Sequence, residues 1–103
     1  MDVVYSAHVH AYQRLKPLDP AGAVDPVNGI RTWVAGMGGA PLVGTMGAPT
    51  AITDVQQSTA WFGIVKFKLY DGGYDWEFIQ APTSPSNPAP KNAFADSGSG
   101  VCH

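Results

Sequence analysis

Alternation of apolar and polar residues predicts four β-strands in this chain of 103 residues. The first is a short run of β-branched and aromatic residues close to the N-terminus. The predicted strands span Asp2 to Ala7, Ile30 to Ala35, Phe62 to Leu69 and Tyr74 to Ile79. Asp71-Gly72-Gly73 is a hairpin turn signal between the last two. The fold class expected from these patterns is mainly β, with little helix.

The predicted hairpin also indicates which side chains face the core. In its first strand the odd positions Gly63, Val65, Phe67 and Leu69 are apolar, so this face is expected to be buried. In the partner strand Tyr74, Trp76 and Phe78 alternate with charged residues. An aromatic row of this kind can stack on sugars or bases, but its alternation with charges favours packing in the core.

Proline and glycine mark the segments between the strands. Leu15 to Asn28 is expected to be a loop or an irregular hairpin arm, and Pro41 to Ser58 a long loop. Ala81 to Asn92 contains four prolines and is expected to be an extended strap, followed by a flexible end at residues 94–103. Residues 1–80 therefore form the expected folded part, and residues 81–103 a strap and C-terminal tail.

Composition narrows the classes of partner. Hydrophobic residues make up 45% and charged residues 14% of the chain, which is typical of a globular protein. Six basic and eight acidic residues give a formal charge of -2 without a basic block, so neither nucleic acid nor an anionic membrane is an expected partner. No transmembrane run and no signal peptide are recognised in this chain. Cys102 is the single cysteine, which excludes an internal disulfide.

The residues with the clearest chemical signal are His8 and His10. They directly follow the first predicted strand, and residues two apart on an extended backbone point to the same side. Neutral imidazoles that converge in this way suit Zn, Fe, Ni or Cu, although a pair of histidines also occurs as ordinary core or surface residues. Asp54 is also a possible ligand, but an isolated aspartate of this kind is more often a solvated or capping residue.

A second candidate is the glycine cluster from Gly36 to Ala40. It lacks the Gly-Lys-Ser/Thr of a phosphate loop and the spacing of a dinucleotide fingerprint, so nucleotide binding is not expected. Its glycines permit unusual backbone angles and close packing.

The string His8-Val9-His10-Ala11-Tyr12-Gln13-Arg14 resembles the last metal-ligand motif of calcineurin-like metallophosphoesterases, most closely that of purple acid phosphatases. The usual form is Gly-His-Val-His-Ala-Tyr-Glu-Arg, so the chain departs from it with Ala7 and Gln13. Three further segments are similar to this family, in the same order. Residues 29–40 are similar to a segment of the family in general, and residues 62–79 and the Asp-Ser-Gly-Ser-x-x-Cys-His tail are similar to its bacterial members.

This resemblance implies that residues 1–80 are the C-terminal part of an αββα metallophosphoesterase sandwich. The family uses two metal ions (Fe, Zn or Mn) and hydrolyses phosphate esters by a metal-bound hydroxide. His8 would bind one ion and His10 the other, with Ala7, Tyr12 and Arg14 flanking the ligands. The family's other ligand motifs do not occur here, so this chain is expected to be inactive without the N-terminal part of the same domain.

The resemblance further implies a secreted or periplasmic parent protein, in which Cys102 would pair with an upstream cysteine. Two alternatives remain open from the residues alone. One is a small, non-catalytic, β-rich binding module in which His8 and His10 are incidental. The other is a structural metal site closed by His103 or by another chain.

Overall fold

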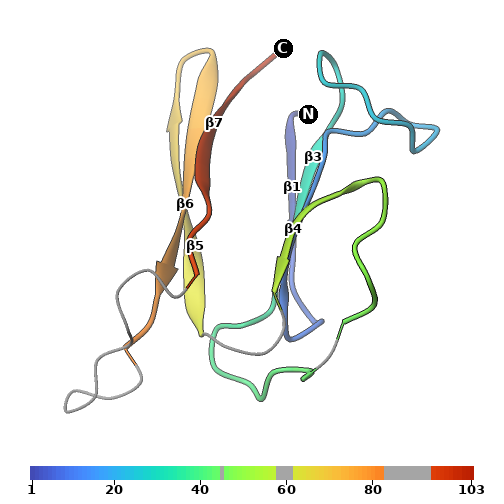
Figure 1. Ribbon diagram of the computed structural model, residues 1–103. Coiled ribbons are helices and arrows are strands. Elements are labelled where there is room, and N and C mark those ends of the chain that lie inside the picture. Colours follow the sequence, from blue (N-terminus) through green and yellow to red (C-terminus); the bar gives the residue numbers. More distant parts are fainter. Residues whose placement is uncertain (45, 58–61, 83–93) are drawn as a thin grey trace.

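The computed structural model describes residues 1–44, 46–57, 62–82 and 94–103, and it has two β-sheets that pack face to face (Figure 1). No helix occurs in these ranges, so the prediction of a mainly β chain with little helix is confirmed. None of these described segments is a helix able to cross a membrane.

The first sheet has four strands in the order β1-β3-β2-β4. The strands are β1 (Val3–Ser6), β2 (Tyr12–Leu15), β3 (Arg31–Ala35) and β4 (Thr53–Gln57). β1 pairs with β3 in parallel, Val3 opposite Arg31, whereas β2 is antiparallel to both β3 and β4. Because β1 and β3 run in the same direction, the segments that follow them leave the sheet at the same edge.

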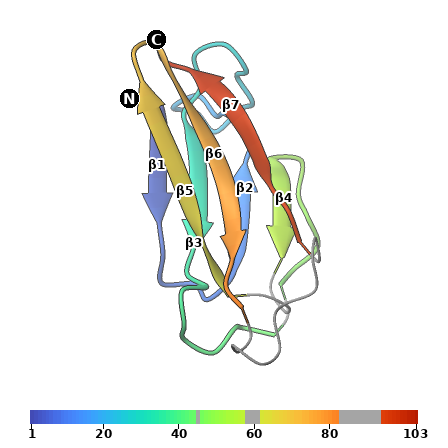
Figure 2. The same cartoon turned by 90° about the vertical axis from the view of Figure 1, so that its left-hand side faces the viewer.

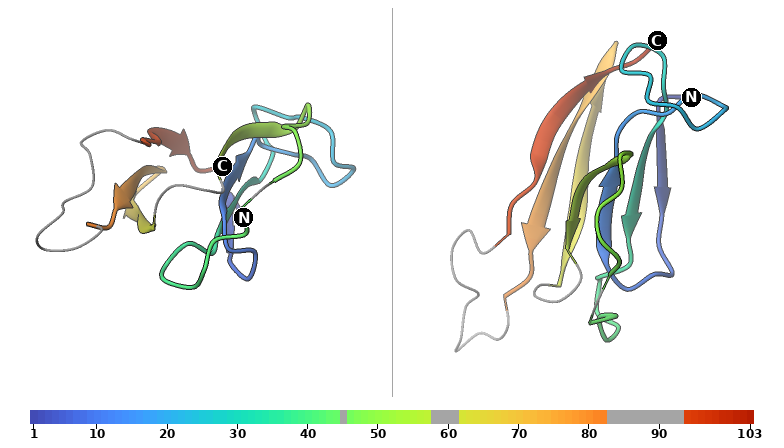
Figure 3. Two further views of the ribbon diagram at one scale, coloured as in Figure 1. Left: turned by 60° about the horizontal axis from the view of Figure 1, so that its bottom comes forward. Right: turned by 45° about the vertical axis from the view of Figure 1, so that its right-hand side comes forward.

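The second sheet is an antiparallel meander of β5 (Gly63–Tyr70), β6 (Gly73–Gln80) and β7 (Ser97–Val101). Gly72 has a φ of 78°, as the predicted Asp-Gly-Gly turn between β5 and β6 requires. In Figure 2 this sheet lies in front of the first, with β5 next to β1 and β7 next to β4. The left view in Figure 3, which looks obliquely toward the ends of the strands, shows the two layers side by side.

Aromatic side chains from both sheets fill the space between the layers. Trp33 of β3 is fully buried and makes edge contacts with Phe67 and Trp76, at centroid distances of 5.0 and 5.3 Å. The prediction that Tyr74, Trp76 and Phe78 face the core is confirmed. The predicted burial of the odd face of β5 is wrong at its end, where Leu69 is 75% exposed.

Glycines on β7 make room for two of these aromatic rings. A Cβ at Gly98 would collide with the indole of Trp76, and one at Gly100 would collide with the ring of Tyr74. The serines that alternate with them, Ser97 and Ser99, are exposed. The alternation of Ser and Gly in the tail is therefore a strand pattern, with hydrogen atoms facing the core in place of side chains.

Two predicted segments differ from the structure. Pro41 to Ser58 was expected to be a loop throughout, yet it contains β4, the polar edge strand of the first sheet. The expected flexible end contains β7, which pairs with β6 over five residues. Most of the predicted strap, residues 83–92, lies outside the described residues.

Candidate functional site

His8 and His10 lie in the tight connection between β1 and β2, beyond the end of the first strand (Figure 1). β1 ends at Ser6, and His8 has a φ of 78°. The backbone from Ala7 to Val9 is therefore not extended, and the argument that residues two apart in a strand point to the same side does not hold here. The position of both histidines at the C-terminal end of a strand is as predicted.

The glycine segment after β3 supports this connection. The N–H of Gly36 donates to the carbonyl of Ala11 at 3.0 Å, and a Cβ at Gly36 would collide with the carbonyl of Val9. The N–H of Val43 donates to the carbonyl of His10 at 3.1 Å. The close packing expected of the glycine cluster is thus found at Gly36, where only glycine lets the two backbones approach.

The ring of His10 is held by a backbone carbonyl. Its Nδ1 lies 2.7 Å from the oxygen of Pro41, which can only accept a hydrogen bond. Nδ1 therefore carries the proton, and in the neutral imidazole Nε2 keeps a free electron pair. Metal-binding histidines usually donate their second ring nitrogen in this way, because the bond fixes both the tautomer and the orientation of the ring.

The described residues supply only part of a metal site. His8 is exposed and His10 half-buried, and nowhere in the described ranges do three or more His, Cys, Asp or Glu side chains gather closely enough to hold an ion. The third histidine, His103, instead bonds Asp2 before β1, with Nδ1 and Oδ1 2.6 Å apart. The two imidazoles fit as ligands, but any metal they bind needs donors from elsewhere.

The flanking residues Tyr12 and Arg14 point into the core from β2. Arg14 is 7% exposed and makes a bidentate ion pair with Asp96, Nε to Oδ2 at 2.8 Å and Nη2 to Oδ1 at 2.9 Å. Its Nη1 also donates to Asp54, and the hydroxyl of Tyr12 donates to Asp96. These two motif residues thus link the first sheet to the segment that leads into β7.

This network changes the acid–base properties of its members. Burial alone would lower the pKa of Arg14, but the hydrogen bonds and charges of Asp96 and Asp54 outweigh it and raise that pKa. Burial, with the bond to the negative Asp96, raises the pKa of Tyr12 well above its ordinary value. Arg14 therefore stays charged and Tyr12 stays neutral, which suits a structural bond better than proton transfer.

Sequence reasoning missed Asp96 and interpreted Asp54 as a solvated or capping residue. The structure instead places both carboxylates against Arg14. The available signal was indirect: an arginine at an inward-facing strand position needs a carboxylate partner.

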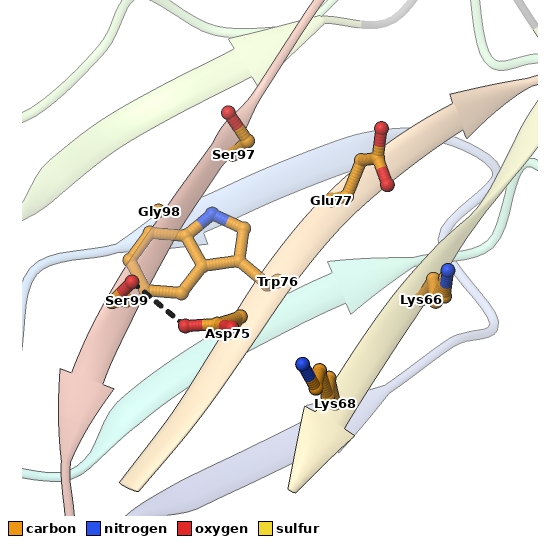
Figure 4. Close-up of a pocket in the computed structure, with 8 residues that line it drawn as sticks. All are labelled: Lys66, Lys68, Asp75, Trp76, Glu77, Ser97, Gly98 and Ser99. Atoms are coloured by element: carbon orange, nitrogen blue, oxygen red, sulfur yellow. Dashed lines mark hydrogen bonds between the residues drawn. The ribbon is translucent and has the colours of Figure 1, made fainter.

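A polar hollow of about 410 Å³ lies on the second sheet (Figure 4). Lys66 and Lys68 of β5 stand opposite Glu77 and Asp75 of β6 in the strand register. Asp75 also accepts a hydrogen bond from Ser99 of β7 at 2.8 Å. Cations and carboxylates alternate across this face, so it presents no net charge to a ligand.

Comparison of the chain with protein-family models, with curated proteins and with solved structures finds no match.

Proposed function

We propose that this chain is the C-terminal part of a dinuclear metallophosphoesterase of the purple acid phosphatase-like branch, and that it contributes His8 and His10 as metal ligands. The proposal starts from the four sequence segments that resemble the family. The observation that carries it furthest is the 2.7 Å bond from His10 to Pro41, because it prepares Nε2 as a ligand atom. The substrate class is a phosphate ester, and the parent protein is secreted or periplasmic.

One side of the sandwich has an uncovered apolar surface, which supports the proposal that the rest of the domain packs there. An apolar groove of about 540 Å³ runs between the edge strands β1 and β5. It is lined by Val3, Tyr5, Ile64, Val65, Phe67 and Leu69. Exposed apolar surface of this kind marks a contact with further protein, which in this proposal is the N-terminal part of the same domain.

In this proposal each residue has a separate task. His8 and His10 hold the metal ions, which when bound supply the Lewis acidity for phosphate ester hydrolysis. Pro41 and Gly36 fix the connection that carries the two rings. Tyr12 and Arg14 take no part in the chemistry; they anchor β2 beneath the ligands through Asp96.

Zinc titration of the 103-residue chain separates the proposal from the structural-site alternative. Two imidazoles without further donors should bind Zn²⁺ weakly, so added Zn²⁺ should leave the free energy of unfolding unchanged both in the unmodified chain and in His8→Ala. Tight zinc binding, together with a loss of zinc-dependent stability in His8→Ala, would instead identify a structural metal site. Calorimetry and urea denaturation measure the two quantities.

The test of function begins with the DNA upstream of the Met1 codon, read in the same frame. We expect Asp-x-His or Asp-x-Gly, Gly-Asp and Gly-Asn-His/Asp motifs to be encoded there. In the longer protein His10→Ala should lower the kcat for p-nitrophenyl phosphate sharply, whereas the matched control His103→Ala should keep it. Full activity in His10→Ala would exclude the ligand assignment, and an in-frame stop before Met1 would favour a non-catalytic binding module.

A further inference from the structure

The two arginines of the chain contact the same indole ring but differ in their partners. The guanidinium carbon of Arg14 lies 4.9 Å from the centroid of Trp76, and that of Arg31 lies 4.8 Å from it. Arg14 is neutralised by two carboxylates. The side chain of Arg31 makes no hydrogen bond or ion pair with any residue that the structure describes, and its buried Nε has no acceptor.

Arg31 lines a cleft of about 320 Å³ at one end of the sandwich. Parts of the loop from Pro17 to Gly29, the end of β5 and the end of β7 form its walls. Arg31 is at the first position of β3, opposite Val3 of the parallel strand β1. The histidines follow the other end of β1, so this cleft is separate from the candidate metal ligands.

Asp2, His103 and the hydroxyls of Tyr70 and Ser99, which also line the cleft, already have partners. Oδ1 of Asp2 accepts from the backbone N–H of His103 at 3.0 Å and lies 2.6 Å from its Nδ1. The hydroxyl of Tyr70 donates to Asp75. Within the described residues, the guanidinium of Arg31 is thus the charged group of this cleft that lacks a counter-ion.

A second donor lies beside the same space. Tyr74 lines the cleft, and its hydroxyl lies against Gly100, where a Cβ would displace it. Burial raises the pKa of Tyr74, so the hydroxyl keeps its proton at neutral pH. A fork of guanidinium N–H groups with a nearby hydroxyl donor matches the oxygens of a carboxylate or a phosphate.

We propose that the cleft around Arg31 binds a small oxyanion, a phosphate or carboxylate group, on the guanidinium that stacks against Trp76. The stacking holds the planar fork in place, so little side-chain entropy is lost on binding. The site needs no metal, and it does not depend on the proposed phosphoesterase function.

Inorganic phosphate and succinate are the probes, added at constant ionic strength with chloride as the reference. The protein is first freed of metal ions on a chelating resin, so that no soluble chelator with carboxylate groups competes for the cleft. The NMR signals of the Nε–H groups of the two arginines show where the added anion binds. We expect the Arg31 signal to shift in a saturable way while the Arg14 signal stays constant. A response to phosphate alone identifies a phosphoryl ligand, a response to succinate identifies a carboxylate, and no response to either overturns the proposal.

Arg31→Gln should raise the apparent dissociation constant about tenfold or more, since one charge-assisted hydrogen bond is worth at least that factor. Lys68→Gln removes the same charge from the exposed face of β5 and should bind as the unmodified chain does. If Arg31→Gln fails to fold by near-UV circular dichroism, Arg31→Lys serves instead, because it keeps the charge and loses the fork. Unweakened binding in a folded Arg31 variant would overturn the assignment.

Discussion

At the scale of single residues, the histidine connection depends on one backbone angle. Among the residues that the structure describes, His8 is the only non-glycine with a positive φ. The family motif usually has glycine one position earlier, where this chain has Ala7. Because the left-handed angle falls on His8, alanine at position 7 is compatible with this backbone. The strain stored at His8 is the kind that persists at ligand-binding positions.

Substitutions at His8 should therefore affect stability through the backbone. His8→Gly should raise the free energy of unfolding by up to about 1 kcal/mol, because relief of about 1–2 kcal/mol of strain exceeds the entropic cost of glycine. His8→Val should lower it by about 1 kcal/mol, since a β-branched residue tolerates this angle poorly. Urea denaturation gives both values. Ala7→Gly is the control and should lower the free energy of unfolding. An equal decrease of the free energy of unfolding in His8→Gly would contradict the strain argument.

At the scale of elements, the sequence predicted the strands whose side chains alternate clearly and missed the others. β2 was missed because one of its inward positions is Arg14, which an alternation pattern counts as polar. β4 is a polar edge strand, Thr-Asp-Val-Gln-Gln, and β7 has glycine at its inward positions, so neither shows an apolar face. The position of the histidines after the first strand was predictable from the hydrophobic run before them. The partner of Arg14 was not predictable, because Asp96 lies 82 residues away.

The inward glycines of β7 allow a direct test. Gly98→Ala should lower the free energy of unfolding by about 1–3 kcal/mol, because the added methyl group overpacks the core against Trp76. Near-UV circular dichroism should change as the indole moves. Ser97→Ala, on the exposed side of the same strand, should stay within about 0.5 kcal/mol of the unmodified chain. Equal effects of the two substitutions would show that β7 does not pack as described.

At the scale of the whole molecule, the two sheets are joined by aromatic packing and, among the residues that the structure describes, by one buried ion pair. Most of the core contacts are non-directional, but the bidentate pair of Arg14 and Asp96 fixes how β2 meets the segment before β7. An apolar pair of equal volume can match such a bond in stability. We therefore expect the ion pair to contribute to the register between the layers. Removal of only one of its two partners should strongly destabilise the chain.

Removing one carboxylate at a time measures this contribution. Asp96→Asn should destabilise the chain by about 3 kcal/mol, because it leaves Arg14 buried with a single partner. Asp54→Asn should cost less than about 1 kcal/mol, since the Asp54 side chain is 36% exposed and that of Asp96 only 6%. Thermal and urea unfolding of both variants provide the comparison. An equal cost at the two positions would contradict the assignment of Asp96 as the main partner.

The separation of Arg14 and Asp96 along the chain also affects the order of events during synthesis. The ribosome releases β1, β2 and β3 long before residue 96 has been made, so Arg14 has no bidentate partner for most of that time. Burial of a charge without its partner is unfavourable, and closure of such a distant contact is slow. We therefore expect β2 to complete its packing against the second sheet only after residue 96 has been synthesised.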